Sequence, residues 1–185
     1  MKSISYTSFP SKFGSFSIVW KKTKNYLKLL RIFLSTPKYH SEELVEINFI
    51  KVHSKSCQTI EKLGIKIQKV FEGESVDFKL NKIALNICSD FQKRVLLAEY
   101  KIPRGWVSTY RRLARAIGIP NGARAVGKAL SNNPFPIIIP CHRAIRSNGE
   151  LGGFQGGLNM KRALLEFEGI KFTPSNTVIM NRIYY

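Results

Sequence analysis

The segment 136–143, Pro-Ile-Ile-Ile-Pro-Cys-His-Arg, is the feature that most restricts how this chain can fold. Three consecutive β-branched isoleucines at 137–139 predict a short, fully buried strand. Pro140 cannot donate a hydrogen bond to a strand ladder, so we expect the strand to end there. Cys141 follows at once, with an imidazole and a guanidinium as its next two neighbours. The fold must therefore hold a cysteine rigidly at the edge of its core, beside cationic groups.

Cys141 has two interpretations at this point. A cysteine after an apolar run is most often a small core residue. Neighbours along a strand point to opposite faces, so adjacency to His142 does not make a dyad. A rigidly held thiol near cationic groups is instead a candidate low-pKa thiolate nucleophile. The rest of the chain decides between the two.

The chain is strongly basic, and its charge is unevenly distributed. Its 185 residues carry a formal net charge of +18, and 44% of them are hydrophobic, so we expect a packed core and exclude global disorder. This surplus indicates a polyanionic partner, either nucleic acid or an anionic membrane surface. No acidic residue lies between Glu99 and Glu150. That segment carries these basic residues: Lys101, Arg104, Arg111, Arg112, Arg115, Arg124, Lys128, Arg143 and Arg146.

Residues 1–85 predict a small α+β domain without an obvious chemical motif. Residues 1–12 are polar and predict a loose end. A helix is predicted within 52–71, where it ends at a glycine-containing break. Strands are predicted at 15–20, 26–34 and 76–80, of which the second also fits a helix.

The segment 86–130 predicts three helices. Ser89 is a good N-cap for the first. Ser108 or Thr109 caps the second, whose apolar residues repeat at i, i+3, i+4 and i+7 until a glycine. The third runs from about 123 to 130. The last two, which are short and joined by a glycine-containing turn in the most basic part of the chain, describe a helix-turn-helix.

The helix at 123–130 is built from small residues, which permit close approach of its backbone to a partner. It reads Ala-Arg-Ala-Val-Gly-Lys-Ala, and Arg124 is the long side chain at its start. Such a helix suits a narrow nucleic-acid groove. A plain packed helix with a solvated arginine is an equally good interpretation of these residues alone.

Five sequence blocks occur in a fixed order: ARAVG at 123–127, NPFP at 133–136, IPCHR at 139–143, GGL at 156–158 and LLEFEG at 164–169. Together they resemble the O6-alkylguanine-DNA alkyltransferases, the methylated-DNA–protein-cysteine methyltransferase family, over roughly residues 86–170. The resemblance implies an α+β fold class. Its expected parts are a small N-terminal α/β, ribonuclease-H-like domain at 1–85, a mostly helical winged helix-turn-helix domain at 86–175 that carries the active-site cysteine, and a C-terminal tail at 176–185.

The resemblance also implies roles for five catalytic residues. Cys141 would accept the alkyl group, and His142 would act through a water as its base. Glu168 would orient the imidazole, and Asn133 would hold the turn that carries Cys141. Tyr110 would donate a hydrogen bond to the target base and crowd its phosphate into rotation. This arrangement follows the general logic of nucleophile, base and orienting group.

Two further sets follow from the same resemblance. Arg124 would be the finger that fills the stack vacated by a flipped nucleotide. The DNA-binding residues would be Arg124, Ala123, Ala125, Gly127, Lys128, Thr109 and Arg143. The substrate pocket would be lined around Ile145, Gly152, Gly153, Phe154 and Gln155. Phe154 stands where the family commonly has tyrosine and Gln155 where it often has serine, which leaves the tolerance for bulky alkyl groups open.

The implied reaction is direct reversal of DNA damage. An alkyl group, such as methyl, would move irreversibly and stoichiometrically from O6-alkylguanine in duplex DNA to Cys141, after the nucleotide is flipped out of the helix. O4-alkylthymine is an open second substrate. The corresponding enzyme is methylated-DNA–[protein]-cysteine S-methyltransferase, EC 2.1.1.63. The reaction needs no metal, nucleotide or methyl donor, so we expect no cofactor, and this chain lacks the N-terminal Cys and His set that holds structural zinc in some members.

The expected setting is a reducing one inside the cell. The cysteines form no CxxC pair, and Cys57 and Cys88 are either core residues or a disulfide pair. Residues 1–10 show no apolar leader, and no run is long enough to span a bilayer. We therefore expect a monomer that binds double-stranded DNA containing O6-alkylguanine and no membrane, in the cytoplasm and, in a prokaryote, at the nucleoid.

Two other function classes compete with alkyl transfer. A DNA-binding regulator or damage sensor could use the same helix-turn-helix without transfer, but the joint presence of Cys141, His142 and Glu168 argues against it. A Cys-His hydrolase would need an oxyanion loop beside the cysteine, and no such glycine loop is present. It would also leave the basic helix pair unexplained.

Overall fold

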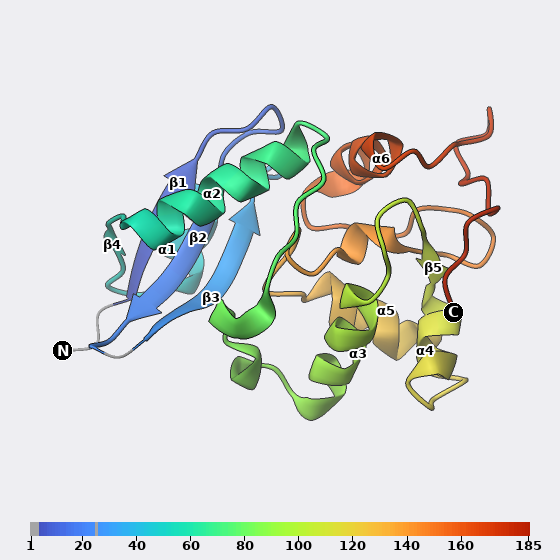
Figure 1. Ribbon diagram of the computed structural model, residues 1–185, viewed down its shortest axis with the longest axis horizontal. Helices are drawn as coiled ribbons and strands as arrows, with labels where there is room; N and C mark the ends of the chain where they lie inside the picture. The colour runs from blue at the N-terminus through green and yellow to red at the C-terminus, as the bar shows by residue number, and fades with distance from the viewer. Residues whose placement is uncertain (1–3, 25) are drawn as a thin grey trace. The chain divides into compact units, whose positions relative to one another are not determined.

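The computed structural model describes residues 4–24 and 26–185 and divides the chain into two compact units (Figure 1). The first comprises 1–87 together with 134–138, and the second comprises 88–133 together with 139–185. The sequence had placed 134–138 in the second domain. The segment belongs to the first unit because the Ile32 N–H donates a hydrogen bond of 2.8 Å to the Pro134 carbonyl.

A four-stranded sheet forms the centre of the first unit. Its strands are β1 (Ile4–Phe9), β2 (Phe16–Lys22), β3 (Leu27–Leu34) and β4 (His53–Ser54). The spatial order is β3-β2-β1-β4, with antiparallel pairing except between β1 and β4, which are parallel. The predicted strands at 15–20 and 26–34 are thus confirmed as β2 and β3.

Two predictions for the first unit are wrong. Residues 4–9 form β1 rather than part of a loose end, because they pair along their whole length with β2, and the Ser8 and Ser17 hydroxyls add a hydrogen bond of 2.7 Å. Residues 1–3 lie outside the described residues. The segment 76–80 pairs with no strand among the described residues and leads into the short 3-10 helices η1 (Leu80–Lys82) and η2 (Leu85–Ile87).

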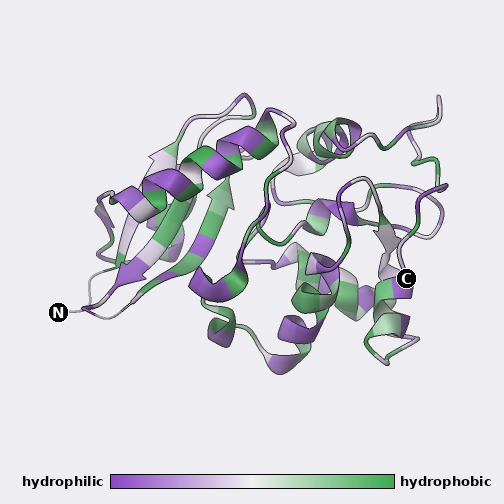
Figure 2. Ribbon diagram, in the orientation of Figure 1, coloured by the Kyte–Doolittle hydropathy of each residue, from purple (hydrophilic) through white to green (hydrophobic). Residues whose placement is uncertain are grey.

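Two helices cover opposite faces of this sheet. Helix α2 (Gln58–Phe71) confirms the predicted helix, and its Phe71 ring packs on Phe16 of β2. Figure 2 shows the alternating apolar and polar stripes along α2 that such one-sided burial requires. Helix α1 (Ser41–Asn48), which the sequence did not predict, buries Val45 against Val19 and Phe33.

The second unit is mostly helical. It contains α3 (Asp90–Tyr100), α4 (Tyr110–Ala116), α5 (Ala123–Ser131) and α6 (Gly157–Phe167), with a small parallel sheet of β5 (Ser108–Thr109) and β6 (Ala144–Ile145). Both predicted caps are confirmed. The Ser89 hydroxyl accepts from the Gln92 N–H at 3.2 Å, and the Thr109 hydroxyl accepts from the Arg112 N–H at 3.1 Å. Local capping chemistry therefore sets where α3 and α4 begin.

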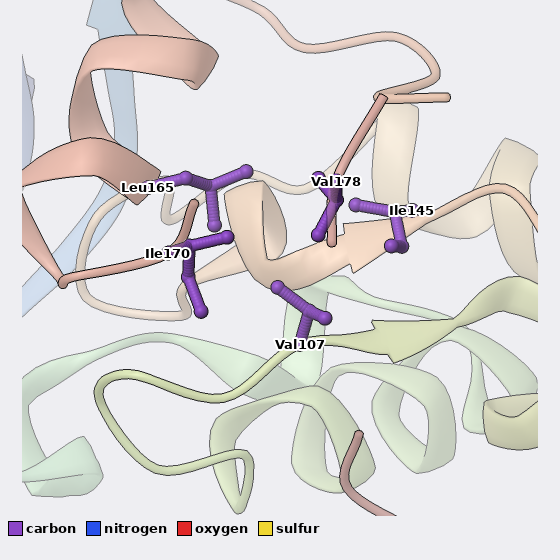
Figure 3. Packing of buried hydrophobic residues seen from close by; sticks show 5 residues of the cluster. All are labelled: Val107, Ile145, Leu165, Ile170 and Val178. Atoms are coloured by element: carbon purple, nitrogen blue, oxygen red, sulfur yellow. The ribbon is translucent and has the colours of Figure 1, made fainter. Parts of the chain in front are cut away.

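The core of the second unit draws on distant parts of the chain. Figure 3 shows Val107, Ile145, Leu165, Ile170 and Val178 packed together, and all five are buried. The segment 176–185 was expected to be a tail, but Val178 belongs to this core. The Val107 N–H also donates to the Arg182 carbonyl at 3.0 Å, and the Val107 carbonyl accepts from the Tyr184 N–H at 2.8 Å.

The three isoleucines at 137–139 are buried, as predicted, but they do not form a strand. The backbone turns there, and Ile137 adopts a positive φ of 72°. Prolines at 134, 136 and 140 each lack a backbone donor, so the segment cannot sustain a ladder. Among the described residues, no helix is both long and apolar enough to cross a membrane.

Candidate active site

Cys141 opens a single 3-10 turn, η3 (Cys141–Arg143), and its side chain is buried. The turn is closed by the Arg143 N–H, which donates to the Pro140 carbonyl at 2.8 Å. The Asn133 amide donates to the Ile139 carbonyl at 3.0 Å and to Cys141 Sγ at 3.2 Å. Asn133 therefore fixes both the turn and the sulfur atom, which is the position predicted for it.

His142, Glu168 and Arg143 form a buried ion-pair assembly beside the cysteine. His142 Nε2 lies 3.0 Å from Glu168 Oε1. Arg143 binds the same carboxylate through two nitrogens, at 2.9 and 2.8 Å, and donates to the Ile102 carbonyl at 2.6 Å. His142 Nδ1 is buried without a hydrogen-bond partner among the described residues. The imidazole is thus held from one side and leaves its other nitrogen available.

The pKa values of this assembly define its charge at neutral pH. Burial raises the pKa of Glu168, but His142 and Arg143 outweigh burial and bring it down to about 2. Burial lowers the pKa of His142, against the opposing attraction of Glu168. The assembly therefore contains an ionised carboxylate and a neutral imidazole, which is the form of histidine that can accept a proton.

The thiol itself is not a low-pKa group, so that prediction is wrong. Burial raises the pKa of Cys141 to about 11, and the hydrogen bond from Asn133 offsets this in part. The nearby guanidinium of Arg143 does not stabilise the thiolate, because Glu168 balances the charge of that guanidinium. Cys141 rests as a thiol, and its ionisation must accompany the reaction.

Tyr110, the first residue of α4, faces the loop after β6. A Cβ atom on Gly152 would lie 2.5 Å from the Tyr110 hydroxyl, so this close approach requires glycine. Burial raises the pKa of Tyr110 to about 12, and the charges of Glu99 and Cys141 add to the effect. The phenol stays protonated and can act as a donor.

A cavity of about 710 Å³ is lined by three of the predicted pocket residues, Gly152, Gly153 and Phe154. The Phe154 ring also meets the His142 ring edge to face, with centroids 6.2 Å apart. Ile145 is placed differently, because its side chain lies in the core of the second unit (Figure 3). Neither Ile145 nor Gln155 lines this cavity.

Helix α5 presents part of the predicted DNA-binding set to solvent. Arg124, Ala125 and Lys128 are exposed, while Ala123 and Gly127 are half-buried. The opposite face, with Val126, Ala129 and Leu130, is buried.

Two of the predicted DNA-binding residues make their contacts inside the protein instead. Thr109 is buried as the N-cap of α4, and all three guanidinium nitrogens of Arg143 donate within the protein. We therefore assign these two residues to support of the site.

The chain is similar to proteins of known activity. The family model described as "6-O-methylguanine DNA methyltransferase, DNA binding domain" matches residues 90–170. Three curated relatives carry the name methylated-DNA–protein-cysteine methyltransferase. That of Methanothermobacter thermautotrophicus is 47% identical over 60% of this chain and 62% of its own length. The Mycobacterium leprae protein is 45% identical over 61% and 67%, and the Metallosphaera sedula protein 40% identical over 69% and 81%.

The chain belongs to the methylated-DNA–protein-cysteine methyltransferase family. A crystal structure of the Mycobacterium tuberculosis O6-methylguanine methyltransferase agrees, with a TM-score of 0.70 and 31% identity over 89% of this chain and 92% of that one. A crystal structure of the Mycobacterium tuberculosis OGT in complex with DNA gives a TM-score of 0.69 at 30% identity. The match to the Methanothermobacter methyltransferase spans about three fifths of that protein's length.

Sequence reasoning missed two buried ionisable residues near this candidate site, Glu99 and Lys161. A signal was present. Glu99 occupies an apolar helical position between Val95 and Ile102, which are both fully buried. A charged residue at a core position of a helical pattern indicates either a satisfied ion or a functional group.

Proposed function

We propose that this protein repairs alkylated DNA as a methylated-DNA–[protein]-cysteine S-methyltransferase. It moves the alkyl group of O6-alkylguanine in duplex DNA to Cys141 Sγ and does so once per molecule. The observation that carries the proposal is the buried cluster in which Asn133 holds Sγ and the adjacent His142 is held by Glu168. A sensor without transfer would have no need for this nucleophile–base–orienter set.

Proton removal from the thiol is the first requirement. With Nε2–H donated to the Glu168 carboxylate, the lone pair of His142 lies on Nδ1, which has no partner among the described residues. We assign to Nδ1 a water that relays the thiol proton to the imidazole. The charged Glu168 stabilises the imidazolium that forms, as an orienting carboxylate does in a catalytic triad.

The transfer is a displacement at the alkyl carbon. The sulfur forms a bond to that carbon, the carbon–O6 bond breaks, and its electron pair stays on the departing guanine. The protonated Tyr110 hydroxyl donates to this guanine and makes it a better leaving group. The product is a thioether, which has no leaving group for water to displace, so the protein is consumed in the reaction.

Access to the target base requires that the nucleotide leave the helix. O6 of guanine lies within the duplex, and enzymes that act on such atoms extrude the nucleotide into a pocket. The exposed Arg124 at the start of α5 fills the gap, and the small residues of α5 allow close approach to the groove. The net charge of +18 favours the phosphates. The protein acts as a monomer in the cytoplasm, at the nucleoid in a prokaryote.

The test is single-turnover transfer from duplex DNA bearing radiolabelled O6-methylguanine. Label is expected on the peptide that contains Cys141, and Cys141→Ser is expected to bind the DNA but take up no label. Binding without transfer by the wild type would favour a sensor, and neither binding nor transfer would favour a hydrolase. The same assay with O4-methylthymine decides whether that base is a second substrate.

A further inference from the structure

Two buried ionisable side chains near Cys141 lie outside the relay described above. Glu99 on α3 and Lys161 on α6 are both 0% exposed. No ion pair joins them to each other among the residues that the structure describes. A buried charge without a direct counter-charge is destabilising, so the presence of both residues calls for a functional reason.

Lys161 is satisfied by backbone oxygens. Its ammonium donates to the carbonyls of Ala144 at 2.6 Å, Leu151 at 2.5 Å and Gly153 at 3.3 Å. These bonds tie the loop that lines the cavity to the strand after the cysteine. An ammonium has three protons to donate, so this geometry fits the charged form of Lys161.

Glu99 is in the opposite situation. Neither carboxylate oxygen has a hydrogen-bond partner among the described residues. Burial raises the pKa of Glu99 to about 8, even though Lys161 and Arg143 oppose the shift. At neutral pH the carboxyl group therefore holds a proton and carries no charge.

Both residues act on the cysteine, and with opposite sign. α3 and α6 each contact the η3 turn. A negative charge on Glu99 raises the pKa of the Cys141 thiol, whereas the charge on Lys161 lowers it. The thiolate is best stabilised when Glu99 is neutral and Lys161 is cationic.

We propose that Glu99 is a positioning residue for alkyl transfer. As a neutral carboxylic acid it leaves the Lys161 ammonium uncompensated beside Cys141, and its ionisation at alkaline pH adds a negative charge that holds back the thiolate. The final step from thiolate to alkyl transfer rests on the proposed function, but the effect on Cys141 does not.

The titration of Glu99 must be considered together with that of the groups around it. Those that interact with it are Lys161, Arg143, Cys141, Tyr110 and Tyr185. The charges of α5 are exposed, and the face of α5 turned inward is apolar. Burial lowers the pKa of Lys161 to about 8, so Glu99 and Lys161 titrate as one coupled pair.

The pair therefore loses two charges as the pH rises. In the wild type its net charge falls from +1 to −1, and in Glu99→Gln it falls from +1 to 0. Above the common pKa of about 8, the variant is one charge more positive beside the sulfur. In Glu99→Gln we thus expect Cys141 to react faster than in the wild type above about pH 8, and at the wild-type rate below it.

The experiment compares the wild type with Glu99→Gln and with Glu166→Gln, an exposed glutamate on α6 that pairs with Arg162. Modification of Cys141 is followed by peptide mass from about pH 6.5 to about pH 9.5, a range that brackets the coupled titration. One reagent is iodoacetamide and the other is O6-benzylguanine. Glu99→Gln is expected to match the wild type at the acid end and to exceed it at least about threefold at the alkaline end. Glu166→Gln is expected to follow the wild type throughout.

Two kinetic results would overturn the proposal. A loss of rate by one constant factor at every pH would mean that Glu99 serves packing, and superimposed profiles would mean that Cys141 does not sense its charge. If Glu99→Gln does not fold, infrared titration of the wild type replaces it, and the proposal fails unless a protonated carboxyl signal disappears near pH 8. If iodoacetamide shows the difference while no protein takes label from duplex DNA bearing radiolabelled O6-methylguanine, the role of Glu99 stands and the proposed function falls.

Discussion

Glu168 is the carboxylate that holds the basic side chains of the site in place. Its carboxylate is shared by His142 and Arg143, and its pKa of about 2 in the folded protein lies far below the value of 4.5 for an unperturbed glutamate. A depressed folded-state pKa stabilises the protein above the unfolded pKa, and this stabilisation is lost as the pH falls towards the folded pKa.

Replacement of Glu168 is therefore expected to change how the stability of the protein depends on pH. Wild-type stability is expected to fall by up to about 3 kcal/mol between about pH 4.5 and pH 2 through this residue. Glu168→Gln cannot titrate, so its urea midpoint is expected to vary less over that range. Transfer at neutral pH is expected to slow about a hundredfold or more because the imidazolium loses its counter-charge. Equal acid sensitivity of both proteins would contradict this account of the ion pair.

Tyr110 offers a cleaner separation of chemistry from stability. Its hydroxyl faces Gly152, and Tyr110→Phe keeps the ring while it removes the donor. Single-turnover transfer is expected to slow by roughly 10² to 10⁴, the range of general acid catalysis. The melting temperature and the DNA affinity are expected to stay close to those of the wild type. A Phe variant with unchanged transfer would remove Tyr110 from the mechanism.

At the scale of elements, helix α5 combines a buried apolar face with an exposed basic one. Arg124 and Lys128 lie one turn apart on that exposed side. They make a matched pair, because both can bind phosphates but only Arg124 stands at the start of the helix, where the finger is proposed.

Arg124→Ala is expected to slow transfer from duplex DNA far more than transfer from free O6-benzylguanine, which has no stack to leave. The difference is on the order of the unstacking energy, a few kcal/mol. Lys128→Ala is the control, and it is expected to weaken DNA affinity without a selective loss on duplex substrate. Paired single-turnover rates on the two substrates measure both. Equal fractional losses for Arg124→Ala on the two substrates would mean that the residue supports the pocket.

Elements whose signals are local could be predicted from the sequence. Ser89 and Thr109 mark the starts of α3 and α4 through bonds within one turn, and the small residues of α5 identify that helix. The isoleucines at 137–139 could not be placed in this way. Their β-branched side chains favour a strand, but the prolines that flank them remove the donors a ladder needs.

At the scale of the whole molecule, the excess of positive charge is expected to govern the proposed association with DNA. Affinity for undamaged duplex is expected to fall on the order of a hundredfold between about 50 and about 200 mM salt, because bound phosphates release counterions. Sequence preference is expected to be weak, since the Ala and Gly residues of α5 offer few groups to read base edges. Titrations at several salt concentrations, on duplexes of different sequence, measure both. A strong preference for one sequence that survives high salt would favour a regulator.

Contacts between segments far apart in the chain were the least predictable part of the molecule. The site residues were found because the PCHR block, Asn133 and Glu168 are specific in sequence, and the structure brings them together. The charge state of Cys141 was not predictable, because burial depends on segments far apart in the chain. The same holds for the inclusion of 134–138 in the first unit and for the packing of Val178.

The raised pKa of the buried thiol has a consequence for storage. With a pKa of about 11, roughly one molecule in ten thousand carries a thiolate at pH 7. Peroxide and stray electrophiles react with thiolates, so the waiting protein is almost inert towards them. A protein that accepts one alkyl group, as proposed here, would be lost by reaction with any other electrophile, and the burial of Cys141 limits that loss.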